Sequence, residues 1–419
     1  MTVDRTLLAR RNRSMGSASP LFYEKPLHLV KGEGAWVWDA EGRRYLDGYN
    51  NVPHVGHCHP RVVDALTQQA RTLNIHTRYL DETVVAYAEA LTSTFPAPLS
   101  TAVFCCSGSE ANELALRMAR FRTGNQGVIV STFNYHGNTA TLAGLTTALP
   151  SPEALAPYAR TIPIPDTLAG DDGEASLRAL NMAIDSLRQS NHGVAALLVD
   201  ALFANEGLPL VPHGWLRAAA ERVRAAGGLM IADEVQAGFG RTGEAMWGHS
   251  VHGIIPDIVT LGKPMGNGHP LAGVISTPDM IESFGRAATY FNTFGGNPVS
   301  AAVGLAVLNV IVDEHLLSNA VETGAHVQAR LHKMAETHDT VARPRGKGLF
   351  FGLDLVDARS GVPDGGGARR VINRMREEGV LISRIGPHDN ILKMRPPMCF
   401  TRDHADHMLD RLDAILAEQ

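Results

Sequence analysis

From about residue 100 onward, short apolar runs alternate with longer amphipathic segments. The apolar runs are TAVFCC, GVIVS, VAALLVD, GLMIAD, DIVTL and LAGVIS, and segments with helical periodicity such as ELALRMARF and WLRAAAERVRAA stand between them. Strands that alternate with helices are typical of a largely parallel sheet covered by helices. The pattern therefore predicts an α/β fold for the central part of the chain.

The two ends of the chain have a different pattern. Trp36-Val37-Trp38 and Arg44-Tyr45-Leu46 flank a turn-like DAEG sequence, which predicts a small β-meander. After Pro298, the segment SAAVGLAVLNVIV predicts a helix that leads into a C-terminal α/β portion with apolar runs at LFFGLDLV and GVLIS. The stretch SGVPDGGGA near residue 365 predicts a surface loop.

Composition and charge exclude several classes of protein. With 419 residues, 44% of them hydrophobic, the chain can bury a large core. Its net charge is only −5 and it has no basic run, so we expect neither a nucleic-acid nor a membrane partner. No stretch approaches the roughly 20 apolar residues of a membrane span. The four cysteines form no C-x-x-C pair, and the N-terminal region lacks a signal-peptide core, so we expect a cytoplasmic protein.

The stretch NNVPHVGHCHP raises the question of a metal site. It places His54, His57, Cys58 and His59 within six residues, and imidazole and thiolate groups are the usual zinc ligands. No second cluster stands elsewhere at metal-site spacing, and prolines bracket the stretch. We therefore expect histidines that pack or form hydrogen bonds, and no metal.

The run CCSGSEANELALRMAR predicts a capped helix directly after a strand. Ser107 and Glu110 have the spacing of a capping box, with Gly108 and Ser109 between them. The start of a helix offers free N–H groups and a positive dipole end to an anion such as a phosphate. A plain capped helix would explain the same pattern without any ligand.

Two further predicted strands end at residues whose side chains could take part in catalysis. GLMIAD ends on Asp233, at the edge of the sheet where ligands bind in open α/β folds, although a strand-end turn would also suit an aspartate. Lys263, one of only six lysines in the chain, follows directly after the predicted strand PDIVTLG. A solvated lysine is the ordinary alternative, but a desolvated lysine is a nucleophile for carbonyl compounds. A helix start that can bind a phosphate, called here the phosphate cup, together with an acid and such a lysine matches the requirements of pyridoxal phosphate.

At this point the chain resembles a known family. The segments SGSEAN, Tyr135-His136-Gly137, ADEVQAGFGRTG, LGKPMGNG and TFGGNP are similar to those of the class III (ω) aminotransferases, which are fold type I pyridoxal phosphate enzymes. The resemblance runs from about residue 25 to the C-terminus. It implies the fold type I transferase architecture: residues 1–50 as the N-terminal segment of a small domain, 51–300 as a large cofactor-binding domain with a mostly parallel sheet, and 301–419 as the rest of the small domain. It also implies a homodimer with shared active sites.

The resemblance assigns roles position by position. Lys263 would hold the cofactor through its amino group and then transfer the proton. Asp233 would pair with the pyridine nitrogen. The remaining predicted cofactor contacts are Gly108 and Ser109 at the phosphate, Tyr135 stacked on the ring with His136 beside it, Gln236 near the ring hydroxyl, and Thr293 of the second subunit at the phosphate.

The substrate side departs from the common family pattern. Where relatives that handle α-carboxylates place an arginine three residues before Pro396-Pro397, this chain has Lys393. Lysine is a point charge and a good phosphate binder. The sequence around it resembles that of the ethanolamine-phosphate phospho-lyase subgroup. This resemblance implies elimination of phosphate from a phosphorylated amine to give acetaldehyde and ammonia. Arg78 and Lys393 are the candidate phosphate contacts, although Arg78 could equally form a surface or interface salt bridge.

Three further points concern the substrate. A usual Glu and Gln are replaced by Asp200 and Phe203, which affects the expected substrate range, and Arg395 stands where these lyases carry lysine. An aminotransferase that uses an amine donor and pyruvate or another oxo-acid is the alternative function. A cofactor-binding protein without catalysis is disfavoured because such a role needs no lysine at position 263.

Overall fold

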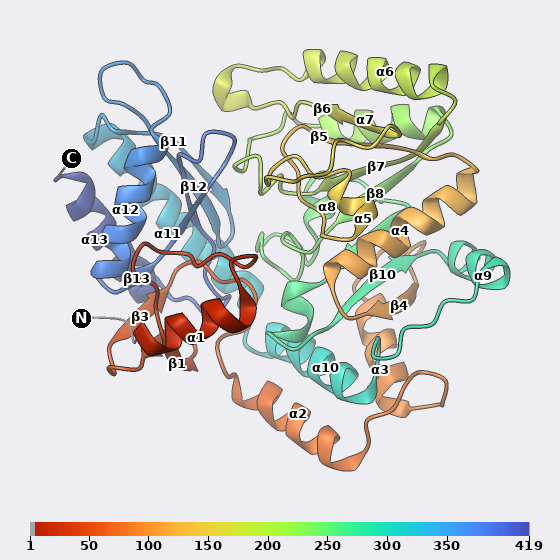
Figure 1. Cartoon of the computed structure of the whole chain (residues 1–419), viewed down its shortest axis with the longest axis horizontal. Helices are drawn as coiled ribbons and strands as arrows, with labels where there is room; N and C mark the ends of the chain where they lie inside the picture. The colour runs from red at the N-terminus through yellow and green to blue at the C-terminus, as the bar shows by residue number, and fades with distance from the viewer. Residues whose placement is uncertain (1–4, 419) are drawn as a thin grey trace.

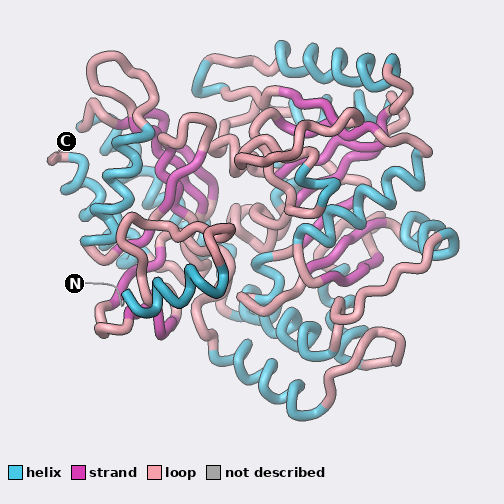
Figure 2. Tube along the Cα trace, in the orientation of Figure 1, coloured by secondary structure: helices cyan, strands magenta, loops and turns pink. Residues whose placement is uncertain are grey.

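The computed structural model describes residues 5–418 and contains one large and two small β-sheets. Figure 1 shows the large sheet with its helices on the right and a smaller lobe, which contains the C-terminal helices, on the left. Figure 2 shows how long loops connect the elements along the boundary between the two parts. Domain boundaries stay a prediction, because the arrangement of sheets does not by itself define them.

The seven-stranded sheet has the order β4-β10-β9-β8-β7-β5-β6. Its strands are β4 (Thr101–Cys105), β5 (Gly127–Ser131), β6 (Ala159–Ile162), β7 (Val194–Asp200), β8 (Leu229–Asp233), β9 (Ile258–Leu261) and β10 (Ala272–Ser276). The five strands β6, β5, β7, β8 and β9 run parallel, whereas β10 is antiparallel to both β9 and β4. The predicted α/β fold with a mostly parallel sheet is confirmed.

Helices cover both faces of this sheet, as the alternation of side chains along its strands requires. On β5 and β7, Val128 and Leu198 pack with α4 (Gly108–Thr123) on one face. Ile129 and Leu197 pack with α6 (Glu174–Gln189) and α7 (Trp215–Ala225) on the other. The helices of this part are α2 (Pro60–Thr72), α3 (Glu82–Thr92), α4 (Gly108–Thr123), α5 (Ala140–Ala143), α6 (Glu174–Gln189), α7 (Trp215–Ala225), α8 (Gly248–Val251), α9 (Pro278–Ala287) and α10 (Pro298–Asp313).

The smaller lobe combines both ends of the chain. Its first sheet has the order β1-β2-β3-β13 and its second the order β11-β12-β15-β14. The N-terminal elements are α1 (Arg5–Met15), β1 (Leu29–Glu33), β2 (Trp36–Asp39) and β3 (Arg44–Asp47). The C-terminal elements are α11 (Leu316–Thr337), β11 (Val341–Lys347), β12 (Phe350–Leu355), α12 (Gly365–Glu377), β13 (Val380–Leu381), β14 (Ser383–Ile385), β15 (Ile391–Met394) and α13 (Arg402–Leu416). Because β13 pairs in parallel with β3, the two ends form one sheet.

The predicted surface loop near residue 365 is partly wrong. Residues 358–364 lie outside helix and strand apart from one bridge at Pro363, but the glycine run begins α12. The Asp364 side chain accepts a 2.7 Å hydrogen bond from the Gly367 N–H and so caps this helix. A good N-cap and the apolar face of the following residues therefore override the low helix propensity of glycine.

Between residues 5 and 418 no single helix is long and apolar enough to cross a membrane. The helices α10 and α11 meet that test of length and composition only as a pair bent by 59°.

Candidate active site

A cavity lies at the carboxyl edge of the large sheet, where the parallel strands β7 and β8 end. Residues from the start of α4, the loop after β5, these two strand ends and the turn after β9 line it. They are Gly108, Ser109, Asn112, Tyr135, His136, Gly137, Asp200, Asp233, Val235, Gln236 and Lys263. All predicted cofactor residues except Thr293 therefore meet at one cavity.

The start of α4 has the predicted capping box. Ser107 Oγ accepts a 3.2 Å hydrogen bond from the Glu110 N–H, and Glu110 Oε2 accepts a 3.1 Å hydrogen bond from the Ser107 N–H. A Cβ on Gly108 would lie 3.0 Å from Val235 Cγ2, a contact that would require the valine side chain to shift. The N–H groups of the first helical turn have no partner within the helix and suit a phosphate.

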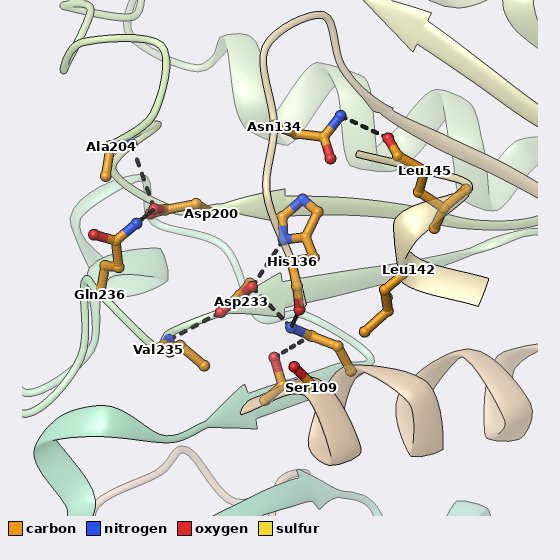
Figure 3. Close-up of polar contacts among 12 residues, drawn as sticks. Ser109, Asn134, His136, Leu142, Leu145, Asp200, Ala204, Asp233, Val235 and Gln236 are labelled. Atoms are coloured by element: carbon orange, nitrogen blue, oxygen red, sulfur yellow. Dashed lines mark hydrogen bonds and ion pairs between the residues drawn. The ribbon is translucent and has the colours of Figure 1, made fainter. Parts of the chain in front are cut away.

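Asp233 is fixed from three sides at the end of β8 (Figure 3). His136 Nδ1 and Asn112 Nδ2 donate hydrogen bonds of 2.8 and 2.9 Å to its Oδ2, and the Val235 N–H donates one of 3.0 Å to its Oδ1. Burial raises the pKa of Asp233, but these hydrogen bonds and the charge of His136 outweigh burial and hold the pKa below its ordinary value. The carboxylate therefore stays ionised, as a partner of a protonated pyridine nitrogen must be.

Lys263 follows β9 and opens a short 3₁₀ turn, Lys263–Gly266. Its φ of +27° is unusual for a residue with a side chain, and strain of this kind is typical of functional sites. Its side chain is exposed to the cavity, while protein atoms surround it on the other sides. Burial and the nearby Arg395 lower its pKa, whereas Asp233 and Asp200 act in the opposite direction. A lysine with a lowered pKa is a better nucleophile and base at neutral pH.

The turn after Lys263 also contacts the histidine-rich stretch. Asn267 Oδ1 accepts a 2.9 Å hydrogen bond from the Val55 N–H, and Asn267 Nδ2 donates one of 2.9 Å to the Gly56 carbonyl. The stretch therefore supports the loop that carries the lysine.

The three histidines of this stretch contact different partners and do not converge. His54 contacts the Phe239 carbonyl at 2.7 Å and Arg241 at 3.1 Å, His57 contacts Asp47 at 2.7 Å, and His59 contacts Glu314 at 2.9 Å. Within the described part of the chain, no group of three or more His, Cys, Asp or Glu side chains is arranged to hold a metal ion. The absence of a metal stays a prediction.

The structure brings the predicted substrate residue Lys393 close to the cofactor cavity together with Arg395. Both side chains are buried, and both donate hydrogen bonds to Gln236 Oε1, the one from Lys393 Nζ at 3.4 Å. They lie 5.4 and 5.3 Å from the centre of the Phe350 ring. Burial, together with Arg395, lowers the pKa of Lys393 well below its ordinary value, while Asp200 and Glu206 oppose this effect.

Sequence reasoning gave Arg395 no role at the site and missed Asn112 altogether. Arg395 stands two positions after Lys393, and on an extended strand this spacing places both side chains on one face. Asn112 stands four positions after Gly108 on α4, one helical turn further along the same face. Asn112 could have been found from the predicted helix, whereas no element was predicted at Lys393 and Arg395.

Arg78 and Thr293 lie away from this cavity in the single chain. Arg78 is exposed, and its guanidinium lies 4.0 Å from the centre of the Phe291 ring. Thr293 is exposed in the loop before α10. Neither lines the cavity, so neither acts on it from the same chain as Lys263 in this arrangement.

The two replacements noted in the sequence differ in their position. Asp200 lies at the cavity, where Gln236 Nε2 donates a 3.4 Å hydrogen bond to its Oδ2 (Figure 3). Burial and the charge of Asp233 raise the pKa of Asp200 to about 6. Phe203 instead packs in the helix layer against Trp215 and His252, so its side chain does not shape the cavity.

A phosphate cup, an ionised acid and a desolvated lysine around one cavity define a pyridoxal phosphate-dependent enzyme, and the residues present fit this cofactor. The aminotransferase class-III family model matches residues 22–416. The chain belongs to the class III aminotransferase family, whose members use pyridoxal phosphate.

Individual relatives cover nearly the whole chain. It is 40% identical to an alanine–glyoxylate aminotransferase 2-like protein of Drosophila melanogaster, over 98% of this chain and 87% of the relative. It is 35% identical to ethanolamine-phosphate phospho-lyase homolog 1 of Caenorhabditis elegans, over 98% and 93% of the two chains. Among solved structures, a phospholyase from Arthrobacter in complex with phosphoethanolamine matches with a TM-score of 0.97 and 52% identity, over 99% of this chain and 100% of that chain.

Proposed function

We propose that this enzyme is a phospho-lyase that eliminates phosphate from a phosphorylated amino alcohol such as phosphoethanolamine. The observation that carries this proposal is the pair of buried cations, Lys393 and Arg395, beside the cofactor cavity. A buried pair of positive charges suits a dianionic group, and phosphate esters provide one. The phospholyase from Arthrobacter, which was solved with phosphoethanolamine, supports the same assignment.

The residues of the site can carry out each step of such an elimination. When bound, pyridoxal phosphate withdraws electrons from the carbon next to the substrate nitrogen. Lys263 takes the proton from that carbon, since its lowered pKa leaves its amine available as a base. The C–O bond on the adjacent carbon then breaks, and its electron pair leaves with the phosphate towards Lys393 and Arg395. Water converts the remaining enamine to acetaldehyde and ammonia.

The measurement that tests this function needs no amine acceptor. The purified enzyme with pyridoxal phosphate is mixed with phosphoethanolamine, and free phosphate and acetaldehyde are followed together. Equal catalytic release of both supports the lyase. No release, with alanine formed only when an amine and pyruvate are supplied, would instead establish the aminotransferase, which the family and the relatives named aminotransferase keep as the second candidate.

We further propose a homodimer in which the second subunit supplies Thr293. Two observations support it. Thr293 lies outside the cavity of its own chain, and large apolar side chains are exposed both next to it in the chain, at Phe291 and Phe294, and at Leu80, two residues after Arg78. Arg78 lies in the same region next to Phe291, so it too would reach a site only across the interface.

We also propose that the enzyme works in a reducing compartment such as the cytoplasm. All four cysteines are free thiols, which supports this location.

A further inference from the structure

A carboxylate that the proposed reaction does not use interacts at longer range with the buried Lys393. Glu206 stands in the loop after β7, and the Ser131 hydroxyl at the end of β5 donates a hydrogen bond to its Oε1. Because β5, β7 and β8 are neighbours in the sheet, Ser131, Asp200 and Asp233 follow one another along the same edge. The site therefore has an acidic side along the sheet in addition to the basic side on β15.

The loop that carries Glu206 packs against β11 and against β15, the strand that carries Lys393 and leads into Arg395. Arg345 Nε donates a 2.7 Å hydrogen bond to the Gly207 carbonyl, and a Cβ on Gly207 would overlap the side chain of Ile391. Ile391, Lys393 and Arg395 alternate along the extended chain and so share one face. Glu206 is thus held on the side of β15 from which Lys393 and Arg395 project.

A buried cation is costly without compensating charge, and burial lowers the pKa of Lys393 for this reason, so nearby carboxylates decide how far its charged form persists while no phosphate is bound. Within residues 5–418, no carboxylate forms a direct ion pair with Lys393, and the cation interacts at longer range with Asp200 and Glu206. A dianionic phosphate at the cations would face the same carboxylates. Repulsion between like charges would then oppose its binding whenever these carboxylates are ionised.

We propose that Glu206 is the resident counter-charge of the substrate-phosphate site and that its ionised form weakens the binding of product phosphate and so promotes its release. The identity of the anion rests on the proposed function. Glu206 acts through Lys393 and does not touch the reacting atoms, so it is a positioning residue.

The charge of Glu206 changes near neutral pH. Burial raises its pKa to about 7, although the hydrogen bond from Ser131 lowers it. The titratable and charged groups that face it from the surrounding elements are Asp200 on β7, His136 after β5, Lys393 and Arg395 at β15, and Arg345 on β11, which pairs with Asp354. Since an acid ionises as the pH rises through its pKa, most of this repulsion develops between pH 6 and pH 8.5.

The test is calorimetric binding of inorganic phosphate to the holoenzyme and to its Glu206→Gln variant between pH 6 and 8.5. Glutamine keeps the size of the side chain and an oxygen for the Ser131 hydroxyl. At each pH, the affinity of the variant for phosphate is divided by that of the unchanged enzyme. This ratio is expected to rise from near one at pH 6 to roughly ten at pH 8.5. The titration of phosphate itself cancels in this ratio. Glu221→Gln, on the exposed face of α7, is the matched control and should bind phosphate as the unchanged enzyme does.

A second variant tests the mechanism without removing the carboxylate. Ser131→Ala deletes the donor that favours the ionised form of Glu206, so the pH at which phosphate binding weakens should move upward. Lys393→Met should abolish the measured binding, which would place the phosphate at the cations.

The inference and the proposed function can fail separately. An affinity ratio near one at every pH, in an enzyme that releases phosphate from phosphoethanolamine, would refute the role of Glu206 and leave the lyase intact. If the ratio rises as expected but phosphoethanolamine releases no phosphate, the role of Glu206 towards an anion stands and the lyase is refuted.

Discussion

Lys263 is the residue whose position depends most on its local chain. A strand end, an unusual φ and a following proline together direct its amine into the cavity, where burial lowers its pKa. The sequence could predict Lys263 and Asp233 because strands of a parallel sheet end at the same edge. Only the family resemblance pointed to Lys393, and no local pattern placed Lys393 or Arg395 beside them, since strand β15 belongs to another sheet and local patterns do not give contacts between sheets.

Replacement of Lys263 should remove both the covalent attachment and the base. Lys263→Ala is expected to lose the visible absorbance of the lysine-bound cofactor and to lower turnover by roughly 10³-fold or more. Absorbance spectra and phosphate release measure the two effects. Lys333→Ala, at an exposed position of α11, is the control. A visible band that persists in Lys263→Ala would mean that another lysine holds the cofactor.

Replacement of Lys393 should affect the substrate and not the cofactor. Lys393→Ala removes one of the two charges that face the phosphate group, so the KM for phosphoethanolamine should rise by roughly 10- to 100-fold. The absorbance of the bound cofactor should be unchanged, because Lys393 does not line the cofactor cavity. Steady-state kinetics and a spectrum measure both, and an unchanged KM would argue against Lys393 as a phosphate contact.

At the scale of elements, the capped start of α4 links folding to cofactor binding. Ser107→Ala removes the N-cap oxygen and should lower the free energy of unfolding by about 1 kcal/mol. It should also weaken cofactor binding, because the same turn forms the phosphate cup. Chemical denaturation and cofactor titration measure the two quantities.

A second helix cap separates these effects. Thr277 caps α9 in the same way, with its hydroxyl accepting a 3.2 Å hydrogen bond from the Met280 N–H, but α9 lies outside the cavity. Thr277→Ala should therefore lower stability by a similar amount and leave cofactor affinity unchanged. Equal losses of cofactor affinity in both variants would show that the loss reflects general stability and not the cup.

The elements themselves were largely predictable. All six apolar runs of the central region are strands, and the predicted helices at ELALRMARF, WLRAAAERVRAA and the segment after Pro298 are present as α4, α7 and α10. The antiparallel direction of β10 and the short strand β6 were not predicted. Hydrophobic periodicity identifies a strand but not its direction, and the four residues of β6 include Arg160 and Thr161, which interrupt the apolar pattern.

At the scale of the whole molecule, the proposed dimer makes a direct prediction. Leu80 and Phe294 are exposed in the single chain, and a charge at either position would be costly in an apolar interface. Phe294→Asp should yield a monomer by light scattering, and its activity should fall because Thr293 no longer reaches the site of a second subunit. Leu149→Asp, which adds a charge at another exposed leucine, is the control. A fully active monomer would contradict the shared site.

The buried carboxylate Asp200 gives the whole protein a pH-dependent stability. Burial and the charge of Asp233 raise its pKa from 3.8 to about 6, so the folded state holds a proton that the unfolded state has released. The free energy of unfolding should therefore fall as the pH rises from about 4 to about 6, by up to roughly 3 kcal/mol from this residue. The Asp200→Asn variant should lack this fall.

Denaturant unfolding of the two proteins at pH 4 and pH 7 measures the effect. The free energy of unfolding of Asp200→Asn, relative to that of the unchanged protein, should be higher at pH 7 than at pH 4. Asp185→Asn, at an exposed position of α6, should follow the unchanged protein at both values. The same difference at both pH values would mean that Asp200 has an ordinary pKa in the folded protein.

The parallel pairing of β3 with β13 has a consequence for synthesis. The pairing joins Leu46 to Val380, so a ribosome releases β3 long before its neighbouring strand exists. At roughly 5–20 residues per second, the interval between them lasts on the order of tens of seconds. During that time the large sheet can assemble, while the β3 edge of the N-terminal meander stays unpaired. Nascent chains that stall between these two strands would therefore expose this edge to other molecules.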